Sequence, residues 1–348
     1  AQAISALELM PFNHIFTPSL WLVLAHSGLV FAGGDCRRIE PDLTVSLIQT
    51  KGRIQPDSSN LVKHGSESAA TSFLRASVPL AWLHVPKAGS SLANALMHTP
   101  TVCPDIGIDE VMNKTTSCKS CDHLYDPMLY NFKVAHHITD IHAVCPGLSN
   151  WGQHKPIGEP GEFENNYEGK GVVMIRQPEQ RIVSSYNHDL HDWPYDDHDV
   201  PKPSSISEYA QVVQGCTVRM LTHKSLNSSY CGDMSELTSD DVTLAKSRLE
   251  KFAFVGLTEE WNLSICLWRA MFGGSCYGSD FLNTRVPRGR TSELYDTSIL
   301  DGFVDRYDGQ LYKKAKDIFK AETQRYGVNQ SSCQPCWDHA ARHWTANT

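Results

Sequence analysis

The sequence lacks an excess of positive charge. It has 31 lysines and arginines against 39 aspartates and glutamates, which gives a formal net charge of -8 at pH 7. A protein that coats nucleic acid needs a dense basic face to displace counterions, so we expect no nucleic-acid partner. With 41% hydrophobic and 20% charged residues, the chain of 348 residues is globular and can bury a substantial core.

The sequence also lacks a long uninterrupted apolar run. Its longest candidate, residues 20–32, is broken by His26, Ser27 and Gly28 and is shorter than a usual membrane span. Three interpretations stay open: a signal-peptide core, a weak membrane anchor at the N-terminus as in Golgi-type enzymes, or a buried strand or helix. We treat residues 1–76 as an N-terminal segment that contains this run and a polar stem.

A third absence concerns nucleotide binding. A P-loop of the Walker type places its lysine after the second glycine, whereas here Lys87 precedes Gly89. The residues around them still indicate a strand, a loop and a helix: the apolar run 80–85, a turn with Lys87, Ser90 and Ser91, and then apolar residues at helical spacing. Such a loop binds anions through its backbone amides and its lysine, or it is an ordinary turn with a surface lysine.

A second stretch, residues 171–186, repeats this design. A buried-looking strand ends at Arg176, and Pro178 stands where a helix would begin. The two stretches predict two anion-binding loops at the ends of two parallel strands.

Together, His-Val-Pro-Lys-Ala-Gly-Ser-Ser and Arg-Gln-Pro-Glu-Gln-Arg-Ile-Val-Ser-Ser-Tyr resemble the 5′-phosphosulfate and 3′-phosphate loops of one enzyme family. These are the sulfotransferases that use 3′-phosphoadenosine-5′-phosphosulfate (PAPS), especially the membrane-associated, Golgi-type carbohydrate branch. The resemblance implies an α/β fold, a P-loop-like three-layer sandwich with a central, mainly parallel sheet flanked by helices. It places the sulfotransferase domain at residues 77–330, followed by a tail at 331–348.

The resemblance also implies roles for individual residues. Lys87 would act in catalysis, and a histidine after a strand between the two loops would be the base, His136 ahead of its neighbour His137; the alternative is a structural histidine. The PAPS-binding residues would be Lys87, Ala88, Gly89, Ser90, Ser91, Leu92, Arg176, Ser184, Arg288 and Arg290. We expect PAPS as co-substrate, no metal, and a hydroxyl-bearing acceptor, most readily a glycan.

Two positions depart from the family pattern: Ala88 stands where threonine is common, and Gln177 where aspartate is common. Two other functions stay open. One is a nucleotide-dependent kinase of related fold, and the other is a catalytically silent lumenal binding protein. Acceptor identity and oligomeric state are left open by the sequence, because acceptor specificity lies in variable loops. Residues 188–199, rich in histidine and carboxylates, favour an acceptor-binding loop over a metal site.

The eleven cysteines indicate disulfides and an oxidising compartment, here the secretory pathway with a Golgi location. The alternative is a zinc site built from the pairs Cys118/Cys121 and Cys333/Cys336. The N-glycosylation acceptor pattern occurs at Asn113, Asn227, Asn262 and Asn329, which favours a glycoprotein of the same compartment. For secondary structure, we expect a loop over 146–170 and helices over 207–223 and 301–326.

Overall fold

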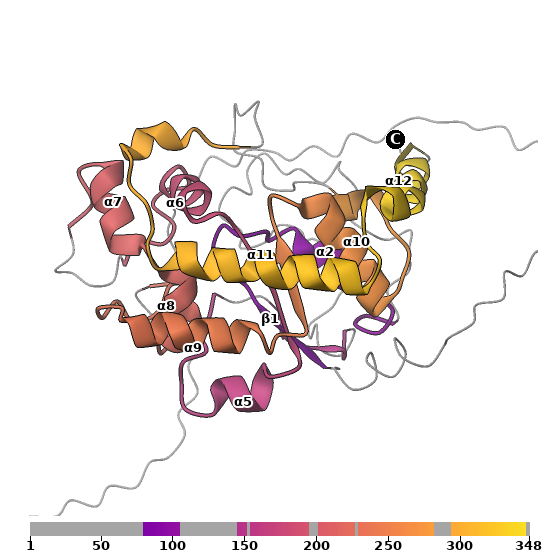
Figure 1. The fold of residues 1–348 in the computed structure, drawn as a ribbon, viewed down its shortest axis with the longest axis horizontal. Coiled ribbons are helices and arrows are strands. Elements are labelled where there is room, and N and C mark those ends of the chain that lie inside the picture. The colour runs from indigo at the N-terminus through magenta and orange to yellow at the C-terminus, as the bar shows by residue number, and fades with distance from the viewer. Residues whose placement is uncertain are drawn as a thin grey trace, which may run out of the picture. The chain divides into compact units, whose positions relative to one another are not determined.

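A sheet of four parallel strands lies at the centre of the computed structural model (Figure 1). The structure describes residues 79–104, 145–151, 154–194, 201–226, 229–281 and 294–345, all within the compact unit Lys63–Thr348. The strands are β1 (Leu80–Leu83), β2 (Leu148–Trp151), β3 (Gly171–Ile175) and β4 (Phe254–Leu257). Their order is β2-β1-β3-β4, so the two strands that precede the predicted anion loops are neighbours in the middle of the sheet.

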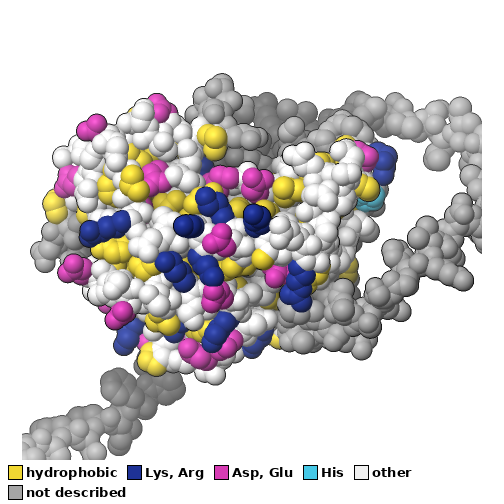
Figure 2. Space-filling model, in the orientation of Figure 1, with side chains coloured by type: hydrophobic (Ala, Val, Ile, Leu, Met, Phe, Trp, Pro, Cys, Tyr) yellow, Lys and Arg dark blue, Asp and Glu magenta, His cyan; other side chains and the backbone are white. Residues whose placement is uncertain are grey.

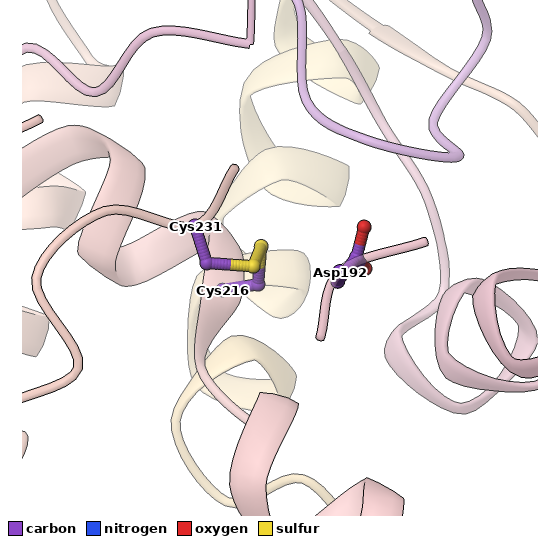
Figure 3. A group of neighbouring side chains, drawn as sticks. All are labelled: Asp192, Cys216 and Cys231. Atoms are coloured by element: carbon purple, nitrogen blue, oxygen red, sulfur yellow. A yellow bond between two sulfur atoms is a disulfide. The ribbon is translucent and has the colours of Figure 1, made fainter. Parts of the chain in front are cut away.

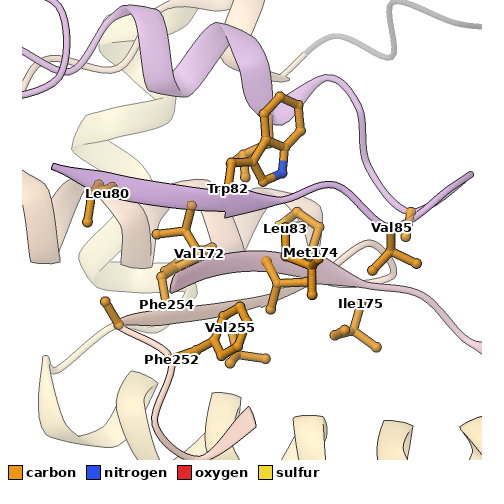
Figure 4. Packing of buried hydrophobic residues seen from close by; sticks show 14 of the residues in the cluster. Leu80, Trp82, Leu83, Val85, Val172, Met174, Ile175, Phe252, Phe254 and Val255 are labelled. Carbon is orange, nitrogen blue, oxygen red and sulfur yellow. The ribbon is translucent and has the colours of Figure 1, made fainter. Parts of the chain in front are cut away.

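The central strands are apolar because both of their faces are covered. Every residue of β1, β3 and β4 is buried, as expected for a parallel sheet between helices. The register pairs Trp82 of β1 with Val172 of β3, and Val172 in turn with Phe254 of β4. Figure 4 shows these side chains packed in one cluster around the strands. Burial of this size fixes the positions of the strand ends and therefore of the loops that follow them.

Helices flank the sheet in two groups. One group is α11 with α9, α8 and α6, and α11 also packs on β4; the other contains α10, α12, α2 and the short helix η3. The bounds are α2 Leu92–Met97, α5 Glu162–Asn166, α6 Pro178–Tyr186, α7 Ile206–Val213, α8 Cys216–Thr222, α9 Ser239–Leu249, α10 Trp261–Phe272, η3 Gly278–Phe281, η4 Thr297–Leu300, α11 Asp308–Arg325 and α12 Gln330–Thr345. The α/β class and the parallel, helix-flanked sheet are therefore confirmed, and the arrangement is compatible with a three-layer sandwich.

Three expected elements differ from the structure. The helix expected over 207–223 is two helices, because Gly215 adopts φ 69°, and a Cβ there would lie 2.2 Å from the Leu237 side chain. The helix expected from 301 begins at Asp308, whose carboxylate accepts hydrogen bonds from the first amides of α8. The expected loop over 146–170 contains the edge strand β2 and the short helix α5.

Four disulfides join described cysteines: Cys103–Cys145, Cys216–Cys231, Cys266–Cys333 and Cys276–Cys336. The last two attach α12 to α10 and to the segment that follows α10. The prediction of disulfides is confirmed, and the zinc alternative is wrong for Cys333 and Cys336, because their sulfurs are already bonded. This many disulfides indicates an oxidising, extracytoplasmic environment.

Over the described ranges, no helix is both long and apolar enough to cross a membrane. The face of the molecule drawn in Figure 2 carries basic and acidic side chains side by side over α11 and α9. Neither sign of charge dominates this face.

Candidate functional site

The two predicted anion loops meet at the carboxyl edge of the sheet. After β1 the chain leaves for the edge strand β2, and it returns to place β3 on the other side of β1. Strand order therefore reverses between β1 and β3, which is where open α/β sheets bind their ligands. At this point the Arg176 guanidinium donates a hydrogen bond to the carbonyl of Lys87, with 3.1 Å between Nη1 and O. The two predicted loops are thus in contact at this edge, and their sharing of one ligand stays a prediction.

The Lys87 loop is tightly constrained. Lys87 itself adopts φ 59°, in the left-handed region, and Gly89 follows with φ 78°. A Cβ on Gly89 would lie 3.0 Å from both Met174 of β3 and Trp261 of α10. Only glycine fits between these neighbours, and the side chain of Ala88 before it is buried in the core. The backbone of the loop is therefore held in one conformation before any ligand arrives.

The serines complete this loop. Ser90 Oγ lies 2.8 Å from Nε2 of His84, and Ser91 is the residue at which α2 begins. Within the described part of the chain, no group accepts a hydrogen bond from the amides of Gly89 or Ser90, so both can donate to an anion. The predicted binding residue Leu92 is fully buried, so only its backbone lies at the loop.

Arg176 and Ser184, the predicted clamp for a second phosphate, are linked through Tyr295. The Arg176 guanidinium lies over the Tyr295 ring, 5.3 Å from its centre, and Ser184 Oγ donates to the Tyr295 hydroxyl at 3.2 Å. The side chain of Gln180 holds the backbone of Tyr295: its Nε2 donates to the Tyr295 carbonyl, and its Oε1 accepts from the Tyr295 amide. Sequence reasoning missed Tyr295, although it follows closely on Arg288 and Arg290, which were predicted to bind PAPS.

Gln177, which stands where aspartate is common in the family, caps a helix in this structure. Its side-chain oxygen accepts a hydrogen bond of 2.7 Å from the amide of Gln180 and so caps α6, which begins at Pro178 as predicted. Glutamine here performs the capping that a shorter polar side chain performs at most helix starts. The substitution therefore leaves the start of α6, and with it Arg176, in place.

A cluster of histidines borders the Lys87 loop, and sequence reasoning missed it. His84 follows β1, His154 follows β2 and His191 follows α6; their rings contact one another in series, with centres 4.2 Å and 5.3 Å apart and with tilted or edge-on planes. Nδ1 of His154 lies 2.7 Å from the carbonyl oxygen of His84, and its Nε2 lies 3.4 Å from Nε2 of His191. Tyr230 packs against the rings of both His154 and His191.

The surroundings of His191 keep its imidazole neutral. Burial lowers the pKa of His191 to about 3, and the neighbouring His154, Lys87 and His188 lower it further, against the opposing effect of Asp192. A carbonyl oxygen can only accept, so His154 carries a proton on Nδ1, while its Nε2 faces Nε2 of His191. This edge of the sheet therefore brings the Lys87 and Arg176 loops together beside a group of three imidazoles, of which that of His191 is neutral.

Several predicted site residues lie outside the described residues. These are the expected base His136, its neighbour His137, and two predicted PAPS-binding arginines, Arg288 and Arg290. Their predicted roles stay predictions.

One further group has the composition of a metal site. Asp192, Cys216 and Cys231 lie within 4.8 Å of one another, but the two cysteines form a disulfide (Figure 3). The Asp192 carboxylate pairs instead with the buried guanidinium of Arg181. This group is therefore part of the core and not a metal centre.

Searches against family models, curated proteins and solved structures found no match for this chain.

Proposed function

We propose that the protein is a sulfotransferase of the secretory pathway, acting in the Golgi, that moves the sulfuryl group of PAPS to a hydroxyl of a carbohydrate acceptor. The observation that carries the proposal is the hydrogen bond from Arg176 to the carbonyl of Lys87 at the reversal point of the sheet. PAPS has a 5′-phosphosulfate and a 3′-phosphate, so it needs two cationic loops within the span of one nucleotide. The four disulfides agree with a lumenal enzyme.

The 5′-phosphosulfate would lie in the Lys87 loop. In the transfer, an acceptor oxygen attacks sulfur in line, the bond from sulfur to the phosphate oxygen breaks, and the electron pair leaves on that oxygen. Lys87 and the amides of Gly89 and Ser90 stabilise the negative charge that forms there. The reaction leaves 3′-phosphoadenosine 5′-phosphate in the loop.

The 3′-phosphate would lie at the other loop. Arg176 supplies a charged donor, and the hydroxyls of Ser184 and Tyr295 lie beside it. Because Gln180 fixes Tyr295 by two hydrogen bonds, the ring positions the guanidinium before the nucleotide binds. This loop distinguishes PAPS from nucleotides that lack a 3′-phosphate.

We assign the general base to His154, whereas the sequence favoured His136. His154 follows a strand between the two loops, which is the place the resemblance implies for the base, and its ring packs against His84 in the cluster beside the Lys87 loop. The carbonyl of His84 fixes the tautomer that accepts a proton from an attacking hydroxyl.

The direct test incubates the full chain with radiolabelled PAPS and a panel of glycan, glycoprotein, glycolipid and small hydroxylated acceptors. We expect label on a carbohydrate. His154→Gln should lower the transfer rate by about 10²- to 10⁴-fold without weakening nucleotide binding, because a base acts on the chemical step. His339→Gln is the control, since its Nδ1 bonds the carbonyl of Cys276 in the same manner.

Two outcomes would contradict this proposal. Binding of PAPS without transfer to any acceptor would favour a silent binding protein. Full activity of His154→Gln, with activity lost in His136→Ala, would return the base to the position that the sequence favoured.

A further inference from the structure

We propose that His154 and His191 form a binding site for a divalent transition-metal ion, represented by Zn²⁺, held between their Nε2 atoms. The second part of the inference rests on the proposed function: the ion inhibits transfer, because it occupies the lone pair that would accept the acceptor's proton. The site is distinct from the group of Asp192, Cys216 and Cys231, whose sulfurs are bonded to each other.

The first support is the spacing of the two nitrogens. Zinc binds histidine nitrogen at about 2.0 to 2.1 Å in tetrahedral geometry, which places two such nitrogens about 3.3 to 3.4 Å apart. The Nε2 atoms of His154 and His191 lie 3.4 Å apart. A nitrogen donor and its acceptor in a good hydrogen bond lie at about 2.7 to 3.2 Å, so the observed spacing suits a shared ion better than a shared proton.

The second support is the direction of the rings. If both rings point their Nε2 atoms at one tetrahedral ion, the ring centres should lie about 5.2 to 5.3 Å apart, since each centre is about 3.2 Å from the metal. The centres lie 5.3 Å apart, with the ring planes at 82°. The distance between the Nε2 atoms and the distance between the ring centres therefore both agree with two rings that point at one ion.

The third support is the hydrogen bond behind the first ligand. Histidines that bind metal almost always donate their other ring N–H to a carbonyl or carboxylate, which fixes the tautomer and the ring orientation. His154 does so through Nδ1, at 2.7 Å from the His84 carbonyl oxygen. Tyr230 packs on both imidazoles, with ring centres 5.0 Å from His154 and 4.9 Å from His191. The two rings are thus held in place without the ion.

The neighbouring charge sets a condition on binding. The ammonium of Lys87 opposes a second cation, and its field already acts on His191. Two protein ligands also leave coordination positions for water or for an oxygen of an anion in the Lys87 loop. We therefore expect inorganic phosphate to strengthen zinc binding, because it brings negative charge beside the ion and offers a ligand oxygen.

The test is a zinc titration of the purified full chain against a chromophoric chelator, for the wild type, His154→Gln, His191→Gln and the double variant. We expect one zinc equivalent in the wild type that weakens at least about tenfold in each single variant and is lost in the double variant. The control His223→Gln, which removes a histidine that bonds the carbonyl of Asp233, should keep that equivalent. Thermal unfolding verifies that each variant is folded.

Equal zinc stoichiometry and affinity in the wild type and the double variant would overturn the proposal. Cobalt gives a second readout: a tetrahedral visible spectrum that appears in the wild type and not in the double variant supports the site, and identical spectra contradict it. Inhibition is measured separately, as the transfer rate of the wild type and of His191→Gln with added zinc, each relative to its own rate without metal. Zinc resistance in the variant supports the inhibitory role, and equal sensitivity contradicts it.

If no chain transfers sulfate, the proposed function fails, while the titration still decides the metal site.

Discussion

Arg176 and Arg181 belong to the same strand-to-helix junction, yet they lie in opposite surroundings. Arg176 reaches the carboxyl edge of the sheet, where it bonds the Lys87 carbonyl and lies over Tyr295. Arg181 is fully buried and pairs with Asp192 and Asp308, with a further hydrogen bond of 3.0 Å to the carbonyl of Val213. In the proposed function the first arginine binds the ligand, whereas the second joins α6 to α11 and to the turn at Asp192.

The same division separates two adjacent residues, His191 and Asp192. The histidine joins the cluster beside the Lys87 loop, and the aspartate enters the buried ion network. Residue type alone does not identify a functional cation in this chain. What marks Arg181 as structural is that it is buried and pairs with two buried carboxylates.

The largest expected effect is the loss of Arg181. Arg181→Leu leaves the carboxylates of Asp192 and Asp308 buried without their cation, so the free energy of unfolding should fall by about 3 to 5 kcal/mol. Urea denaturation measures this change. Arg325→Leu on the exposed end of α11 is the control and should change stability little. A stable Arg181→Leu would mean that the network does not support the fold.

A smaller effect concerns the acidic side of that network. Burial, and then the neighbouring Asp308, raise the pKa of Asp305 to about 7. The folded chain therefore keeps a proton that the unfolded chain releases between about pH 4 and pH 7, so stability falls as pH rises through this window. We expect a loss on the order of 2 to 3 kcal/mol between pH 5 and pH 8.

Urea midpoints at the two pH values, for the wild type and Asp305→Asn, measure this pH dependence. The asparagine does not titrate, so the variant should depend less on pH, whatever its absolute stability. An identical slope in both proteins would assign the pH dependence to other groups. The ligand edge of the molecule should be insensitive to this change.

The two strands and the edge where Lys87 and Arg176 lie could be predicted from the sequence, because they follow from the local pattern of apolar and charged residues. Apolar runs that end in a cation located β1 and β3, and parallel pairing of buried strands brings Lys87 and Arg176 to one edge. The histidine site could not be predicted in this way. Strand β2 is short, lies at the edge and has the polar residues Ser149 and Asn150 at its centre, so it gave no strand signal before His154.

Tertiary contacts decide the remaining differences. Asp192 belongs to a stretch that resembled an exposed acceptor loop, and only its pairing with Arg181 reveals that it is buried. Helix α11 starts later than the pattern predicts, because Asp308 bonds the amides of Thr217 and Val218. The first contact joins α6 to a turn that follows it, and the second joins α11 to α8; periodicity within one element encodes neither.

At the ligand edge, Arg176→Gln should weaken binding of 3′-phosphoadenosine 5′-phosphate by about 10- to 100-fold, because a charge-assisted hydrogen bond contributes about 1.5 to 3 kcal/mol. Calorimetry gives the affinity, and thermal unfolding should show little loss of stability, in contrast to Arg181→Leu. The matched control is Arg306→Gln, another arginine that lies over a tyrosine, 4.9 Å from the Tyr307 ring centre. Equal losses in both variants would indicate a general charge effect instead of a defined site.

The smallest expected effect tests how Arg176 is positioned. Tyr295→Phe keeps the ring under the guanidinium and removes only the hydroxyl that accepts from Ser184, so nucleotide affinity should fall by about two- to fivefold, the worth of one neutral hydrogen bond. Tyr295→Leu also removes the ring and should cost more, since a cation over an aromatic face contributes about 0.5 to 1 kcal/mol or above. Both affinities come from the same calorimetric titration, with Tyr307→Phe as the control. If the phenylalanine variant binds as weakly as Arg176→Gln, the hydroxyl itself contacts the ligand, and the clamp contains a third member.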